Sequence, residues 1–524
     1  MKRSVTAFTL LLTSVSAILG SGWLFSAYYT AQYAGPSALL SWLIAGFCVM
    51  FVAFVFAELN AMLPIMGAST RIPQVTHGTL VGFMYSWIIW VCYAAIPPTE
   101  VQAVIQYMSF YYPALTKSTG GLTEDGYVCA TILMIILSTF NAYSLRWLLR
   151  CNTTLTLMKI IIPILIIAFV FAFYFNPHHI IHPANSDFMP MGVKGMLSAI
   201  SAGGIIYAFN GFTQACELGG AVKKPAISLP IAIVGSVFLT LLIYLGLQAT
   251  FLTSLTHRNL FYGWQHISLT GGNSPFAAIL HQDGFEWLIP ILFVGAIIGP
   301  LAAGLIYASG AAQSLKSKSM NGYLPSFLQI LSSQNTPIYA ILVNFLVGMM
   351  MFAPLPGWNK MISFLTSLMT LTYTIGPICL IALRDQAPTQ KRPLKLPFGN
   401  IWGAIAFYIC TVFSYFNGWE IISKMGLSFI AGLFVLLIYR TFSKRAKEIQ
   451  LHWRASIWIW PYIGGLTLIS YLGSIGTGKN ILPFGLDLVV IAVFCIFILL
   501  LAKYFKLPSA TTQQYIEAMS VSHH

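Results

Sequence analysis

Charged residues are scarce in this chain of 524 residues, where Asp, Glu, Lys and Arg together make up only 8% of the composition. Hydrophobic residues make up 57%, and the mean hydropathy is +0.79. A water-soluble domain of this length cannot cover its surface with so few charges. Between Ser4 and Ala57 no residue is charged at all. The chain is therefore expected to be a polytopic membrane protein, with the lipid bilayer as its solvent.

Other patterns are missing too. Membrane β-barrels alternate in polarity over segments of about ten residues, whereas the apolar runs here are continuous over about 18 or more, which predicts an all-α fold. The eight cysteines include no C-x-x-C pair, so they are interpreted as small core residues. The 27 basic residues are spread over short loops and form no stripe for a nucleic acid. We expect no nucleic-acid partner and no cofactor.

Catalytic clusters are also missing. All ten histidines fall outside the predicted spans, without paired carboxylates beside them, whereas a membrane-embedded enzyme needs such groups near an interface. His178, His179 and His182 have a spacing suited to a metal ion, but Asp187 is the only carboxylate nearby. The sequence therefore predicts neither an enzyme nor a metal site.

Fourteen apolar segments are predicted to cross the bilayer. With the amino terminus inside, twenty of the 27 basic residues lie in cytoplasmic loops, six lie in external loops, and Lys159 lies within a segment. This asymmetry follows the positive-inside rule and places both termini in the cytoplasm. The predicted segments are 7–33, 37–63, 79–110, 127–145, 154–175, 195–220, 226–253, 286–313, 337–353, 361–383, 401–419, 425–440, 455–474 and 484–502.

The first segment is interrupted by glycines on either side of a serine, in the run Gly20-Ser21-Gly22-Trp23. About 13 residues precede the interruption, which at about 1.5 Å of rise each places it deep in a hydrocarbon core of about 30 Å. Unwound backbone is tolerated there only where it lines a cavity, and its free N–H groups form an anion-binding helix start. The alternative is a kink that lets helices pack closely.

The sixth segment carries a second interruption, from Gly203 to Gly211. Two broken helices five spans apart predict inverted repeats, over about residues 7–175 and 195–384, and favour a binding site over a packing kink. We expect a ten-helix core over 1–384, four additional helices over 385–506 and a disordered cytoplasmic tail over 507–524. Carbonyl groups opened at Ala208, Phe209 and Asn210 attract a cation, while the first break attracts a carboxylate. Together they predict a site for an α-amino acid.

These motifs resemble the signatures of the amino acid–polyamine–organocation permeases. Beside the two breaks, the resemblance rests on Glu58-Leu59, on the run from His77 to Phe83, on Lys223-Lys224-Pro225 and on the run from Asn321 to Pro325. It covers about residues 10–440, and with fourteen spans the chain is most similar to the bacterial aspartate:proton symporter-like permeases. The resemblance implies the LeuT-like 5+5 inverted-repeat fold, with broken helices 1 and 6, alternating access and location in a bacterial inner membrane.

The resemblance also implies roles for individual residues. It places the substrate carboxylate at the first break and its amine at the second, with Tyr207 as an aromatic gate and Phe209 as a second candidate. Relatives carry an acidic residue where this chain has Ala221, so a cytoplasmic gate that uses that acid is not expected. The substrate-binding candidates are Gly20, Ser21, Gly22, Trp23, Tyr207, Ala208, Phe209, Asn210 and Gly211.

Charges within the spans are the candidates for proton coupling. A lysine near the bilayer centre costs about 2.5 to 3.5 kcal/mol on insertion scales, so Lys159 is expected to have a function, and the resemblance implies the same. The alternative is that the long aliphatic side chain of Lys159 extends its ammonium group to the cytoplasmic lipid headgroups. Glu100, which follows two prolines, is expected to carry a proton or to contact the substrate, and the alternative is a structural role in the helix kink. Glu58 and Glu217 are gate candidates near the cytoplasmic face.

The sequence thus predicts a secondary active transporter that imports an amino acid, with an acidic, aspartate-like substrate favoured, by proton symport. The alternatives are an amino acid exchanger and a permease for neutral or basic amino acids. A channel is a more distant alternative, because it needs no titratable lysine.

Overall fold

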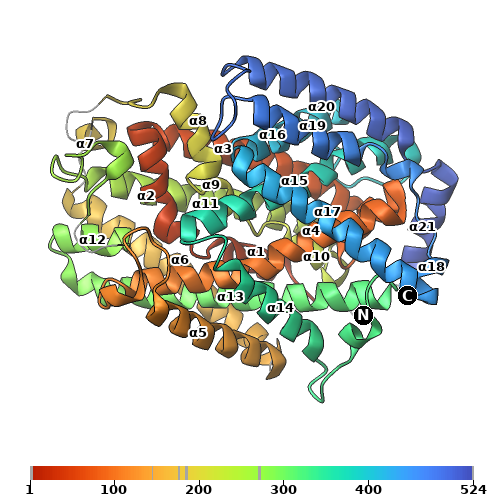
Figure 1. Cartoon of the computed structure of the whole chain (residues 1–524), viewed down its shortest axis with the longest axis horizontal. Helices are drawn as coiled ribbons and strands as arrows, with labels where there is room; N and C mark the ends of the chain where they lie inside the picture. Colours follow the sequence, from red (N-terminus) through yellow and green to blue (C-terminus); the bar gives the residue numbers. More distant parts are fainter. Residues whose placement is uncertain (1–3, 144, 175–176, 183–186, 270–272, 522–524) are drawn as a thin grey trace.

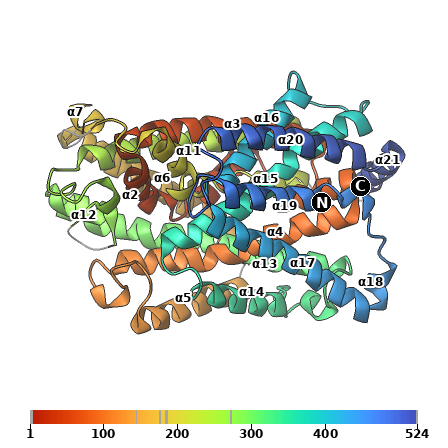
Figure 2. The ribbon, with the colours of Figure 1, turned by 45° about the horizontal axis from the view of Figure 1, so that its top comes forward.

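The computed structural model describes residues 4–143, 145–174, 177–182, 187–269 and 273–521. Over these residues the chain is built from helices, and β-structure is limited to isolated bridges. Long helices run side by side along the molecule (Figures 1 and 2). Their bounds are α1 (Ala7–Ile18), α2 (Gly22–Ala34), α3 (Ala38–Met62), α4 (Ala68–Met108), α5 (Glu124–Tyr143), α6 (Leu145–Tyr174), α7 (Pro177–Ile181), α8 (Gly192–Ala202), α9 (Ile205–Ala208), α10 (Gln214–Glu217), α11 (Pro225–Thr253), α12 (Pro275–Gln282), α13 (Ile289–Met320), α14 (Ile338–Met351), α15 (Trp358–Gln386), α16 (Gly399–Tyr415), α17 (Trp419–Phe442), α18 (Lys444–Glu448), α19 (Ile459–Leu472), α20 (Leu486–Phe505) and α21 (Ser509–Val521).

Among the described residues, ten helical segments are long and apolar enough to cross a membrane, and three shorter apolar helices accompany them. Each of the fourteen predicted segments coincides with a helix or with the pieces of a broken helix. The number of crossings itself stays a prediction. The two ends of the chain lie toward the same end of the bundle (Figures 1 and 2), as an even number of crossings requires.

The most deeply buried long helices are α4 and α15, which contact each other near the middle of the bundle. Helix α13 packs on α4, and α11 packs on both α1 and α3. Helices α5 and α14 lie on one side of this centre, and α16 and α20 lie on the opposite side (Figure 2). The outer helices expose large apolar side chains, such as Ile132, Leu346 and Phe497, and lipid is the solvent that such a surface needs.

Both predicted helix breaks are confirmed. The first lies between the end of α1 at Ile18 and the start of α2 at Gly22. The second begins after α8, where Gly204 has φ +88°, a conformation open mainly to glycine. It continues beyond the four-residue helix α9 to Gly211, which has φ +131°. Each break separates short helical pieces that would otherwise form one span.

One expectation from the sequence is wrong. The sequence predicts a disordered tail, but residues 509–521 form α21, which is anchored because the Thr512 hydroxyl donates to the Val75 carbonyl oxygen over 3.1 Å. The difference arises because this helix packs on a segment distant in sequence. Helix α4 is interrupted at Gly78 (φ +84°), so His77 ends its first piece and lies just before the predicted span 79–110.

Candidate functional site

The two breaks lie against each other. A Cβ atom built on Gly22 would lie 3.0 Å from both the Cα and the Cβ of Ala208. The Tyr244 hydroxyl from α11 lies within hydrogen-bond distance of both breaks, 3.2 Å from the Ile18 carbonyl oxygen and 2.9 Å from the Ala208 carbonyl oxygen. The Tyr244 hydroxyl therefore contacts the backbone of both breaks and holds the two unwound segments together.

A carboxylate of the protein itself occupies the helix start at the first break. The Ser21 N–H donates to Glu100 Oε2 over 2.9 Å, and the Tyr207 hydroxyl donates to Glu100 Oε1 over 2.8 Å. Glu100 is buried within α4, and a side chain on Gly20 would collide with its carboxyl group. The anion site predicted from the glycines is therefore filled, and α4 supplies the anion. Glu100, Ser21 and Tyr207 form what we call the carboxylate cluster.

An indole covers the carboxylate cluster on one side. Trp358, the first residue of α15, donates from Nε1 to the Ser21 hydroxyl oxygen over 2.8 Å. Its ring stacks on Phe25 and Tyr29 of α2, with centroid distances of 4.7 and 5.7 Å. Sequence reasoning missed Trp358, because a tryptophan at the start of a span is typical of membrane-interface belts.

Lys159 is placed at the other side of the first break. Its Nζ donates to the Ser16 carbonyl oxygen over 3.0 Å and lies 3.4 Å from the Ser16 hydroxyl. Ser16 lies in the last turn of α1, where the helix dipole favours a cation. The ammonium group is buried, so it does not reach the cytoplasmic headgroups. The alternative of a lysine that extends to the interface is therefore disfavoured.

The second break presents a different polar group. Asn210 donates from Nδ2 to the Tyr307 hydroxyl and accepts from the Tyr373 hydroxyl, each over 3.1 Å. A cavity of about 20 Å³ adjoins it and is also lined by Tyr93 and Thr213. This volume holds about one water molecule.

The other candidates of the second break are not brought to the carboxylate cluster. The Phe209 ring packs edge-on against Trp42 and Tyr244, between α3 and α11. Gly211 lies against α1, where a Cβ would be 2.6 Å from the Ile18 nitrogen. The gating role of Phe209 stays a prediction that these contacts do not favour, whereas Tyr207 points at Glu100.

Comparison with known proteins agrees with this architecture. Residues 5–436 match the model of a family described as amino acid permease. The chain belongs to the amino acid permease family. Its relatives include the aspartate-proton symporter of Bacillus subtilis (strain 168), which is 31% identical over 519 residues and covers 97% of this chain and 98% of the relative. The glutamate/serine transporter AimA of the same organism is 29% identical over 500 residues, with 94% and 92% covered. A branched-chain amino acid permease, BcaP, is 25% identical over 455 residues, with 84% and 93% covered.

Membership confirms the resemblance seen in the sequence and the LeuT-like fold with its broken helices 1 and 6. The family consists of transporters, so the prediction that this permease is no enzyme is also confirmed.

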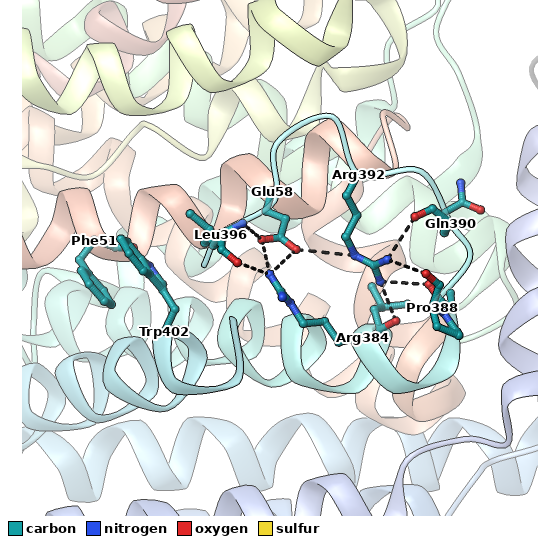
Figure 3. A network of polar contacts seen from close by, with 10 residues as sticks. Phe51, Glu58, Arg384, Pro388, Gln390, Arg392, Leu396 and Trp402 are labelled. Atoms are coloured by element: carbon teal, nitrogen blue, oxygen red, sulfur yellow. Dashed lines mark hydrogen bonds and ion pairs between the residues drawn. The ribbon is translucent and has the colours of Figure 1, made fainter. Parts of the chain in front are cut away.

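Glu58 of the permease lies in a separate ionic network (Figure 3). Its buried carboxylate accepts from Arg384 Nη2 at 2.9 and 2.8 Å and from the Leu396 N–H at 2.8 Å, and Arg392 Nε lies 3.7 Å away. The network joins α3 to the end of α15 and to the segment that leads into α16. This arrangement holds the segment between α15 and α16 in place, and a gating role for Glu58 stays a prediction.

Glu217 lies in α10 and is not part of that network. Its carbonyl oxygen accepts from the Gly67 N–H over 3.0 Å. Its Oε1 is buried and has no hydrogen-bond partner among the described residues. Lys318 of α13, also buried, donates to the Ser314 hydroxyl within its own helix over 2.6 Å.

Removal of the Glu58 charge is expected to destabilise the permease. In Glu58→Gln, Arg384 and Arg392 would keep their burial without a counter-ion, and a broken buried pair costs about 3 kcal/mol or more. Thermal unfolding of the purified protein in detergent would measure the loss. The matched control is Glu420→Gln, which breaks an exposed pair with Lys424 within one helix and should cost less than about 0.5 kcal/mol. Equal effects of the two changes would show that the buried network adds nothing.

Proposed function

We infer that the permease is a secondary active transporter that imports an amino acid together with a proton. The substrate site between the two breaks opens alternately to the two sides of the membrane. The observation that carries this proposal is the carboxylate cluster. The Ser21 N–H and the Tyr207 hydroxyl already hold a carboxylate, that of Glu100, at the helix start. A site that binds one carboxylate by these donors can bind another.

Competition between two carboxylates supplies the coupling. The α-carboxylate of the substrate needs the same Ser21 N–H that Glu100 Oε2 accepts. A proton on Glu100 removes its negative charge, so the glutamate releases the helix start and the substrate takes its place. After the substrate leaves toward the cytoplasm, Glu100 loses its proton there and returns to Ser21. Substrate and proton then move in the same direction.

Lys159 supplies the second half of the proposed cycle. Its ammonium binds the carbonyl end of α1 through Ser16, while Ser21 begins the second half of the same span. A charged ammonium holds the end of α1 in place, and loss of its proton would free it. In other transporters with unwound helices, backbone carbonyl groups coordinate a metal cation. The Lys159 ammonium replaces such a cation here.

An acidic amino acid is the favoured substrate. Relatives named as an aspartate-proton symporter and a glutamate/serine transporter align over nearly the whole chain. Trp23 Nε1, which is buried beside the first break and has no partner among the described residues, is a donor for an oxygen of the substrate side chain. A Cβ on Gly299 would lie 3.7 Å from this nitrogen and 4.0 Å from the nearest Gly20 atom.

Uptake into proteoliposomes tests proton symport against exchange. Vesicles without internal amino acid should accumulate aspartate or glutamate when the outside is made acidic, and a protonophore should abolish the accumulation. Accumulation that requires preloaded amino acid and ignores the pH gradient would mean an exchanger instead.

Thermal unfolding with each of the twenty amino acids tests the substrate class. A ligand at about 100 times its dissociation constant adds about 2.7 kcal/mol to the stability of the folded state. Aspartate and glutamate should raise the unfolding temperature most. Stabilisation by lysine or arginine alone would overturn the acidic assignment while leaving the transporter class intact.

The location proposed is the cytoplasmic membrane of a bacterium, with both termini in the cytoplasm. The distribution of basic residues and the common end at which both termini lie support this orientation.

A further inference from the structure

A cavity of about 720 Å³ lies beyond the Trp358 stack, outside the carboxylate cluster. Gln32 and Tyr33 line it from α2, one turn further from the break than Tyr29. Asn359, the residue after Trp358, lines it from α15. The volume falls within the range of about 300 to 1,000 Å³ found for small-molecule sites. This outer cavity thus lies next to the stacked Tyr29 and Trp358 rings, on the side away from the first break.

Helix α8 leads from the outer cavity to the second break. Lys194, Ser198 and Ala202 line the cavity at successive turns of this helix, and the break begins at Gly203. A molecule in the cavity would thus contact the outer ends of both broken spans. This places the cavity on the route from the external face.

The charged side chains that line the outer cavity are of one sign, positive. Among the described residues of the lining, Lys194 and His266 can carry positive charge, and none is an aspartate or a glutamate. The amide groups of Gln265 and Asn359 add hydrogen-bond donors, whereas Asn417 Nδ2 already donates to the Phe413 and Ser414 carbonyl oxygens. A cavity lined by one sign of charge concentrates ligands of the opposite sign. The chemistry fits a small anion that also offers oxygen acceptors.

Helices beyond residue 385 complete the wall. Phe416 and Asn417 follow the last residue of α16, and Ile475 and Gly476 lie in the connection between α19 and α20. These two segments touch at glycines, because a Cβ on Gly418 would lie 3.2 Å from the Gly476 Cα. The outer cavity therefore depends on the helices that follow the ten-helix core.

We propose that the outer cavity is a capture site for acidic amino acids, in which Lys194 and His266 attract the side-chain carboxylate before the Tyr29–Trp358 stack opens. The site rests on the proposed function, since it supplies the carboxylate cluster with substrate. The later helices contribute selectivity for the substrate at the external face.

Uptake kinetics test this site. Lys194→Gln should raise KM for aspartate about fivefold at low salt with little change in the maximal rate, and Lys194→Glu should raise it further. KM for serine should stay constant if serine is also carried, and the aspartate effect should shrink at 0.5 M salt because of screening. Lys117→Gln, an exposed external lysine outside the cavity, is the matched control. An unchanged KM for aspartate in both Lys194 variants would overturn the capture site, whereas absence of aspartate uptake by the unmodified protein would overturn the acidic substrate itself.

A chemical probe measures the charge of the cavity without transport. In Asn417→Cys, a methanethiosulfonate with a sulfonate group should react faster than one with a trimethylammonium group, relative to the same ratio for a free thiol. Addition of Lys194→Glu should reverse the preference, and the unmodified chain gives the background of the native cysteines. A ratio that Lys194→Glu does not change would show that Lys194 sets no field in the cavity and would also overturn the proposal.

Discussion

Valine in place of Gly22 is expected to abolish substrate binding and to lower uptake by at least about 100-fold. A single Cβ at this position would already lie 3.0 Å from two atoms of Ala208, and valine adds two further carbons. The breaks would have to separate, so the Ser21 N–H and the Tyr207 hydroxyl would no longer point at one carboxylate. A displacement of about 1 Å in a binding geometry costs about 10²-fold.

The measurement is the rise in unfolding temperature on addition of aspartate, followed by uptake in proteoliposomes. Gly22→Ala should give an intermediate loss, because its one carbon requires Ala208 to move by only a few tenths of an ångström. Gly464→Val is the matched control, since Gly464 lies in α19 and a Cβ there meets nothing within 4 Å. A Gly22→Val protein that is folded and binds aspartate normally would refute a substrate site between the breaks.

The breaks could be predicted from the sequence because glycines stand close together there, on both sides of Ser21 and from Gly203 to Gly211, and clustered glycines weaken a helix. Gly22 and Gly211 each lie against backbone of the other broken span. The candidates for coupling could also be predicted. Lys159 and Glu100 are charges within apolar segments, where burial without a partner is costly.

The partners of these residues could not be predicted. Tyr244, Tyr307 and Trp358 are aromatic residues in apolar helices, a pattern that packing produces far more often than function. Their hydrogen bonds to Ile18, Asn210 and Ser21 depend on how distant spans meet.

The ion pairs could not be predicted either. Arg384 is 326 residues from Glu58, so no local pattern connects them. Occupation of the helix start by Glu100 depends on how α4 packs against the break, and sequence periodicity does not contain that information.

Alanine in place of Lys159 is expected to separate binding from coupling. The ammonium contacts Ser16 at the end of α1 and not the carboxylate cluster, so aspartate should still raise the unfolding temperature, and exchange of internal for external aspartate should continue. Accumulation driven by an inward proton gradient should fall at least tenfold. The matched control is Lys318→Ala, another buried lysine, whose bonds lie within its own helix, and it should keep that accumulation.

Glu100→Gln completes the test, because the two residues carry different parts of the proposed cycle. Glutamine is neutral, like protonated glutamate, so it should leave the Ser21 N–H open to the substrate at every pH. Exchange should then become insensitive to pH between about 5 and 8, while accumulation by the proton gradient is lost. If Lys159→Ala accumulates aspartate normally and Glu100→Gln does not, the proton is carried by the glutamate alone and the lysine only anchors α1. If both variants accumulate normally, competition between two carboxylates is not the coupling step.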